Sequence, residues 1–128
     1  MTDNYTKTIL IVDDEAIIAM EEAATLKNHG FHTIVAHTGE EAIEMAAVQA
    51  GIDLVLMDID LGSGMDGTQA AEVILEHLDI PVLFLSSHTE PEVVEKTEGI
   101  TSYGYVVKNS GETVLLASIK MAFKLHSA

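Results

Sequence analysis

Acidic side chains follow two apolar runs of this chain, at the point where each run ends. Asp58 comes directly after residues 53–57, and Asp13 and Asp14 follow residues 8–12. If both runs are buried parallel strands, their carboxylates emerge at the same sheet edge, where open α/β sheets bind ligands. Crowded carboxylates repel one another, and a hard divalent cation such as Mg2+ accepts oxygen ligands of this kind while recruiting a phosphate. The spacing therefore predicts Mg2+-assisted phosphoryl chemistry at Asp58.

The elements that would position these carboxylates alternate along the chain. Short apolar or β-branched runs predict strands at residues 8–12, 32–36, 53–57, 82–85 and 105–107. Helical composition or spacing follows each of them, over residues 15–29, from 38 to the glycine at 51, over 68–77 and 91–98, and from 110 onwards. This order predicts an α/β fold, a doubly wound five-stranded parallel sheet of flavodoxin-like order 2-1-3-4-5 with helices on both faces.

Several helix ends carry their own signals. Thr38 and Glu41 have the spacing of a capping box, and Ser110 is placed to cap the last helix. Residues 91–98 offer only Val93 and Val94 as apolar anchors, so we expect that helix to be short or mobile.

Composition limits the class of protein. The 128 residues predict a single domain over 1–128, with residues 1–6 a flexible tail and no output domain. There is no cysteine, no apolar run long enough to cross a membrane, and no signal peptide, so we expect a cytoplasmic protein that does not enter membranes. A formal charge of -15 predicts that the domain does not bind nucleic acid directly.

Two further strand ends deliver polar groups to the same edge. Ser86 follows the fourth predicted strand, and Lys108 follows the fifth. Asp58 suits nucleophilic attack on phosphorus because a carboxylate needs no deprotonation at neutral pH. Lys108 would supply positive charge to a phosphoryl oxygen, and the Ser86 hydroxyl could donate to another.

These four strand ends together resemble the receiver domain of the two-component response regulator family, over nearly the whole chain. The segment Met65-Asp66-Gly67 also fits that family. The resemblance implies that a phosphohistidine of a sensor histidine kinase or phosphotransfer protein donates its phosphoryl group to Asp58. It implies a signalling switch rather than an enzyme.

The resemblance also assigns roles to the other residues. Mg2+ would be bound by Asp13, Asp14, Asp58 and the backbone carbonyl of Asp60. Lys108 and Ser86 would contact the phosphoryl group. Ser86 would also act as the switch hydroxyl, and Tyr105 as the aromatic side chain that turns inward when Ser86 moves.

The sequence departs from the family pattern at three places. Asn109 follows Lys108 where the family usually has a cis proline, and we favour a trans bond that re-aims Lys108, because a cis bond before asparagine is costly. The loop Gly62-Ser63-Gly64 lacks the usual proline and gains backbone freedom beside Asp58. The third departure lies in residues expected to tune the lifetime of the phosphoryl group, namely Asp60, Ser87 and His88.

Alternatives remain open from the residues alone. The chain could be the N-terminal receiver fragment of a hybrid sensor kinase, since its last helix ends without a glycine stop. Asp58-Ile59-Asp60 also resembles the nucleophile motif of haloacid-dehalogenase-like phosphatases, although nothing acidic but Glu112 follows Lys108. A flavodoxin is disfavoured because Asp13-Asp14-Glu15 would repel the flavin phosphate.

Overall fold

The structure is a computed structural model that describes residues 6–62, 64–87, 91–101 and 103–127. Strands and helices alternate through these residues. Their bounds are β1 Thr8–Val12, α1 Ala16–Asn28, β2 His32–Ala36, α2 Gly39–Val48, β3 Ile52–Asp58, α3 Gly67–His77, β4 Val82–Ser86, α4 Pro91–Ile100, β5 Tyr105–Val107 and α5 Glu112–Ser127.

All strand pairs of the sheet are parallel, in the order β2-β1-β3-β4-β5. This confirms the predicted fold class and strand order. Val12 pairs with Met57, so Asp13 and Asp58 leave two adjacent strands at the same level. The register between β1 and β3 shifts at Thr8, where the amide of Thr8 donates instead to the side chain of Asp53, at 2.8 Å.

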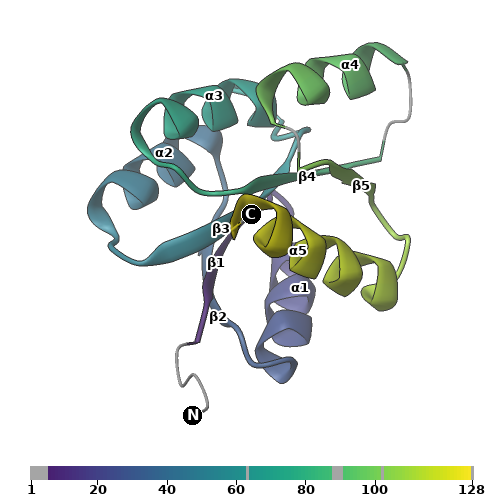
Figure 1. Cartoon of the computed structure of the whole chain (residues 1–128). Coiled ribbons are helices and arrows are strands. Elements are labelled where there is room, and N and C mark those ends of the chain that lie inside the picture. The colour runs from purple at the N-terminus through teal and green to yellow at the C-terminus, as the bar shows by residue number, and fades with distance from the viewer. Residues whose placement is uncertain (1–5, 63, 88–90, 102, 128) are drawn as a thin grey trace.

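Helices cover both faces of the sheet (Figure 1). Alternate strand residues point to opposite faces, so that Leu10 and Met57 pack with α2 and α3, while Ile11 and Leu56 pack with α1 and α5. Small residues such as Ala70 let the helices approach the sheet closely. The three central strands β1, β3 and β4 are buried on both faces, which explains their largely continuous apolar sequence.

Two predicted details of the helix ends are corrected by the structure. Thr38 caps α2 as predicted, by accepting from the amide of Glu41, but the Glu41 carboxylate accepts from His37 rather than from Thr38. The helix α5 begins at Glu112, so Ser110 does not precede it directly, and the Ser110 hydroxyl donates to the carbonyl of Val107.

The helix α4, expected to be short or mobile, has 10 residues, as many as α2 and fewer than α1, α3 or α5. The structure therefore does not contradict the expectation of a short helix, and its mobility stays a prediction. The helix is weakly anchored to the rest of the fold, because Thr97 is its one buried residue.

The start of α3 is fixed directly to the end of β3. The amide of Gly67 donates to the carbonyl of Ile59 at 3.0 Å, and a Cβ atom at position 67 would overlap the carbonyl oxygen of Asp58. Asp66 caps the helix in a complete capping box with Gln69. Only glycine allows the helix to begin this close to the strand end that carries Asp58.

Candidate functional site

Asp58 lies at the carboxyl end of β3 and is fully buried. Its Oδ1 atom accepts a hydrogen bond from the amide of Asp60 at 3.0 Å, and its Oδ2 atom accepts one from Lys108 Nζ at 2.8 Å. The side chain is thus held at both oxygens.

The acidic pair after β1 lies beside Asp58. Carboxylate oxygens of Asp13, Asp14 and Asp58 lie within 4.8 Å of one another, as the sequence predicted. Asp13 is fully buried and Asp14 is exposed. Oδ1 of Asp13 accepts from the amide of Glu15 at 2.9 Å, while its buried Oδ2 receives no hydrogen bond from the described residues.

This arrangement fits a hard divalent cation. A buried carboxylate oxygen without a hydrogen bond costs free energy, which a cation ligated by that oxygen would recover. The three oxygens offer the donor type that Mg2+ prefers, and the exposure of Asp14 leaves one side open to water. The backbone carbonyl of Asp60, also expected as a ligand, follows Asp58 by two residues.

Lys108 brings positive charge to these carboxylates. Besides Asp58, its Nζ lies 3.6 Å from Asp13 Oδ2 and 3.7 Å from Glu15 Oε1. No described peptide bond is cis, so the bond to Asn109 is trans, as we favoured, yet Lys108 still reaches Asp58. The turn is made by Asn109 at a φ of 67° and Gly111 at 103°, and the amide of Lys108 donates to the carbonyl of Ser86 at 2.8 Å.

Burial and neighbouring charges have opposing effects on the pKa values of Asp58 and Lys108. Burial raises the pKa of Asp58 to about 6, although the hydrogen bond and charge of Lys108 act to lower it and Asp13 adds repulsion. Burial acts to lower the pKa of Lys108, but the hydrogen bond and charge of Asp58 outweigh it and raise that pKa well above its ordinary value. Lys108 is therefore a permanent cation, while the Asp58 charge is held at a cost.

The remaining predicted residues lie around this centre. Ser86 is fully buried at the end of β4, and Tyr105 is half-buried on the neighbouring β5. Asp60 and Ser87 are exposed on the loops that follow β3 and β4, and His88 lies outside the described residues. The switch and tuning roles of these residues stay predictions.

Two residues of the site were not found from the sequence. Glu15 contributes the third carboxylate near Lys108. His37 follows β2, and its Nδ1 lies 3.1 Å from the carbonyl oxygen of Asp13, where it can donate to hold that residue in place. Both could have been found by applying the strand-end argument to the residues one position further along and to the neighbouring strand.

Known protein sequences resemble this chain over most of its length. A family model of the response regulator receiver domain matches residues 9–120. Transcriptional regulatory protein PdtaR of Mycobacterium tuberculosis is 31% identical over 117 residues, which cover 91% of this chain and 56% of PdtaR. YvrH of Bacillus subtilis is 32% identical over 120 residues, covering 91% of this chain and 49% of YvrH. The chain spans about half the length, or less, of the curated relatives it matches.

Solved structures are also similar. The N-terminal domain of a response regulator/sensory box/GGDEF protein from Carboxydothermus hydrogenoformans is 45% identical with a TM-score of 0.87, covering 94% of this chain and 97% of that one. The CheX-CheY-BeF3-Mg+2 complex from Borrelia burgdorferi contains a chain that is 25% identical with a TM-score of 0.83, covering 91% of this chain and 89% of that one. Within the described residues, no helix has the length and apolar composition needed to span a bilayer.

Proposed function

The chain belongs to the response regulator receiver domain family, and from this premise we propose that it is a phosphorylation-dependent switch whose phosphoacceptor is Asp58. The observation that supports this most is the convergence of Asp58, Asp13, Asp14 and Lys108 at one sheet edge, with Lys108 Nζ 2.8 Å from Asp58 Oδ2. The family is a signalling family, which argues against the phosphatase alternative.

The proposed donor is a phosphohistidine of a sensor histidine kinase or phosphotransfer protein. A carboxylate oxygen of Asp58 attacks phosphorus, the phosphorus–nitrogen bond breaks, and the imidazole leaves with its electron pair. The product is an acyl phosphate, which remains reactive enough to be removed and so makes a reversible mark. The Lys108 ammonium, which already lies against Asp58, would pair with the phosphoryl oxygens once the negative charge is on them rather than on the carboxylate.

Mg2+ is the cofactor that the donor set supports. Asp13, Asp14, Asp58 and the Asp60 carbonyl would hold it. When bound, it would offset the repulsion between an anionic nucleophile and an anionic donor. The similar chain from Borrelia burgdorferi, solved in a complex named for BeF3 and Mg+2, supports this assignment.

The proposed output is a change at the face around α4. Ser86 would contact the new phosphoryl group, and Tyr105, on the strand next to β4, would respond to its movement. The α4 helix lies over this region with one buried residue, so a modest interaction free energy could shift it. Asp60, Ser87 and His88 would tune the lifetime of the mark.

Several wider expectations belong to this proposal. A charge of -15 opposes direct binding of nucleic acid, and the effector is unidentified. A stand-alone regulator and the receiver part of a longer protein, including a hybrid sensor kinase, are both compatible with a chain that spans about half of its relatives.

Intact-mass spectrometry after incubation with acetyl phosphate tests the phosphoacceptor. We expect one phosphoryl adduct with Mg2+, none without Mg2+, and none in Asp58→Asn. Asp79→Asn is the matched control, because it removes an exposed carboxylate that lies outside the site and should keep the adduct. A metal-independent adduct, or one that persists in Asp58→Asn, would contradict the proposal.

A further inference from the structure

A cleft of about 200 Å3 lies between α1 and α5, beside the phosphorylation site. Ile18, Glu21 and Glu22 of α1 line one wall, and the loop after β5 with the start of α5 lines the other. Lys108 belongs to this second wall and is the one cationic side chain among the described residues that line the cleft. The same lysine therefore borders both the cleft and the site.

Glu22 is the feature of this cleft that the proposed function does not use. Its Oε1 atom is buried and receives no hydrogen bond from the described residues. Such an oxygen destabilises the fold, whereas an apolar side chain at this position could pack against Ile18 and Leu115 without that cost. Packing alone does not explain a glutamate here.

The charges that face Glu22 come from every neighbouring element. Burial is the main cause that raises the pKa of Glu22 to about 7, Asp13 of β1 and Asp58 of β3 add to it, and Lys108 opposes them. Glu21 on the same helix adds a smaller repulsion. Glu112 of α5 also lines the cleft, paired with His29 at 3.4 Å. Lys108 is thus the one group in this set that favours the charged form of Glu22.

Lys108 in turn is shared. Its Nζ lies 2.8 Å from Asp58, 3.6 Å from Asp13 and 3.7 Å from Glu15, and its side chain is 16% exposed. A flexible four-carbon side chain between two groups of carboxylates can divide its charge between them.

We propose that Glu22 is a positioning residue for Lys108: its carboxylate competes from the cleft with Asp58 for the lysine ammonium and restrains phosphoryl transfer. The inference rests on the proposed function, because its consequence is measured at Asp58. A charged Glu22 lowers the positive potential that an incoming phosphoryl group meets. A neutral Glu22 leaves Lys108 committed to the site.

The first test measures the coupling without any phosphorylation. The 13C signal of the Glu22 carboxyl, assigned by its loss in Glu22→Gln, is titrated by NMR in the parent and in Lys108→Met. We expect the Glu22 pKa to rise when the ammonium is removed, because Lys108 is the group that opposes its protonation. An unchanged titration would overturn the proposal.

The second test measures the consequence. Initial rates of phosphorylation by acetyl phosphate with Mg2+ are compared between Glu22→Gln and the parent at one pH below and one pH above the Glu22 pKa. That pKa is taken from the NMR titration repeated with Mg2+, because the value of about 7 includes repulsion from Asp13 and Asp58, which the cation would offset. The rate of Glu22→Gln divided by the rate of the parent should be near one at the lower pH and about three at the higher pH.

Glu21→Gln is the matched control, since it removes an exposed carboxylate from the mouth of the same cleft. Its ratio should stay near one at both pH values. A Glu22→Gln ratio that does not rise with pH would overturn the proposal. If no variant is phosphorylated at all, the proposed function fails instead, and the NMR titration still decides whether Glu22 and Lys108 are coupled.

Discussion

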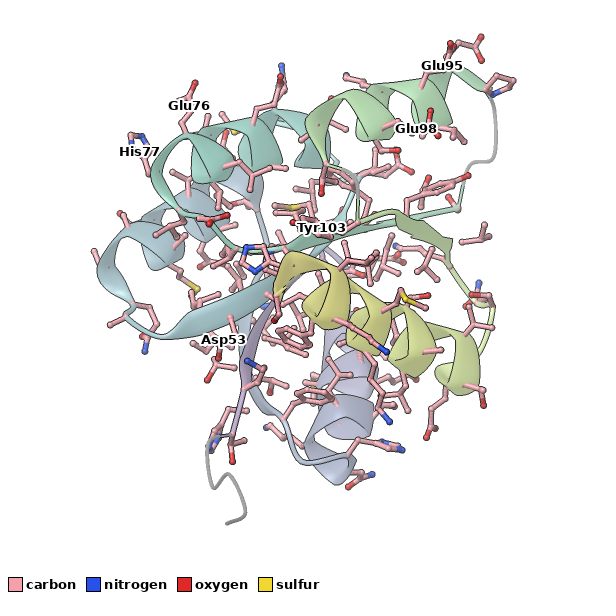
Figure 2. The ribbon with its side chains drawn as sticks, in the orientation of Figure 1. Asp53, Glu76, His77, Glu95, Glu98 and Tyr103 are labelled. Carbon is pink, nitrogen blue, oxygen red and sulfur yellow. The ribbon has the colours of Figure 1, made fainter. Side chains whose placement is uncertain are left out.

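The helices α3 and α4 lie side by side in one layer but are attached to the sheet very differently (Figure 1). Five residues of α3 are buried, and its first turn is fixed by Gly67 and by the capping box of Asp66. In α4 only Thr97 is buried. Figure 2 shows Glu76 on α3 and Glu95 and Glu98 on α4. Each of these three side chains is exposed, on the outer side of this layer.

This difference suggests that the two helices have different roles. An element with many buried contacts opens only at a large fraction of the global free energy of unfolding, whereas one with few can move at little cost. The β3 end that α3 holds carries Asp58, whose geometry must stay fixed. The α4 helix carries no residue of the predicted site, and under the proposed function it moves in response to phosphorylation there.

The largest effect that would sharpen this contrast comes from two glycine substitutions. Gly67→Ala would force a Cβ atom against the Asp58 carbonyl, and we expect a loss of about 3 kcal/mol or more of unfolding free energy. Gly99→Ala on α4 has open space around it and should stabilise the protein by about 0.5–1 kcal/mol. Urea unfolding followed by circular dichroism measures both.

The two variants are each other's control, because each adds the same methyl group to one helix of the layer. A small loss for Gly67→Ala would show that the start of α3 can yield. A large loss for Gly99→Ala would show that α4 is packed more tightly than the structure indicates.

Mg2+ should stabilise the end of β3 and the start of α3 rather than α4. At a concentration about ten times its Kd, Mg2+ should add about 1.4 kcal/mol to the unfolding free energy near neutral pH. It should increase the hydrogen-exchange protection of the Asp60 and Gly67 amides more than that of α4.

The effect should depend on pH through Asp58. Because its pKa in the folded protein is raised to about 6, protons compete with Mg2+ as the pH falls through that value, and the stabilisation should shrink. Without Mg2+, the contribution of Asp58 to stability changes with pH in the opposite direction. The raised pKa means that the Asp58 contribution to stability is fully present below about pH 4 and is lost as the pH rises through about 6. Thermal unfolding with and without Mg2+ across this range checks both signs, and a Mg2+ effect that grows on acidification would contradict the assignment.

The sequence predicted the parts of the fold that depend on burial. Strands covered on both faces must be continuously apolar, so the central strands β1, β3 and β4 could be found, and their polar ends followed from them. The edge strand β2 was found from its β-branched residues instead. Asp13, Asp14, Asp58 and Lys108 are brought together as this argument requires. The strand order was predicted from the alternation of strands and helices and from the right-handed crossover rule, and the family resemblance agrees with it.

The rest depended on contacts between distant segments. The helix α4 extends to Ile100, beyond the predicted end at residue 98, because a solvent-facing helix has few apolar anchors that mark its end. The buried oxygen of Glu22 and the contact from His37 to Asp13 could not be ranked without knowing which side chains converge. The trans bond before Asn109 was favoured on energetic grounds, but that Lys108 still reaches Asp58 depends on the turn geometry.

The cap of α3 offers a third, smaller test. Asp66→Ala removes the acceptor for the Gln69 amide and the Thr68 hydroxyl and should cost about 1 kcal/mol. Asp66→Asn keeps a capping oxygen and should cost much less. Burial acts to raise the pKa of Asp66, but the hydrogen bonds from Thr68 and Gln69 outweigh it and lower that pKa. The stabilisation is therefore present above about pH 4 and lost as the pH falls through the lower folded value, which urea unfolding at several pH values would show.

The smallest effect concerns the ion pair that links the two helices. Lys96 Nζ of α4 lies 3.7 Å from Asp66 Oδ2, and both side chains are largely exposed, at 55% and 41%. Lys96→Met should therefore cost about 0.5 kcal/mol or less, and added salt at about 1 M should remove the difference. Hydrogen exchange in α4 should change little, with Lys120→Met on α5 as a control for the loss of one exposed lysine. A cost above about 1 kcal/mol, or a marked loss of protection confined to α4, would mean that this helix is held by charge near its middle. The contrast with α3 would then lie in the kind of attachment rather than in its strength.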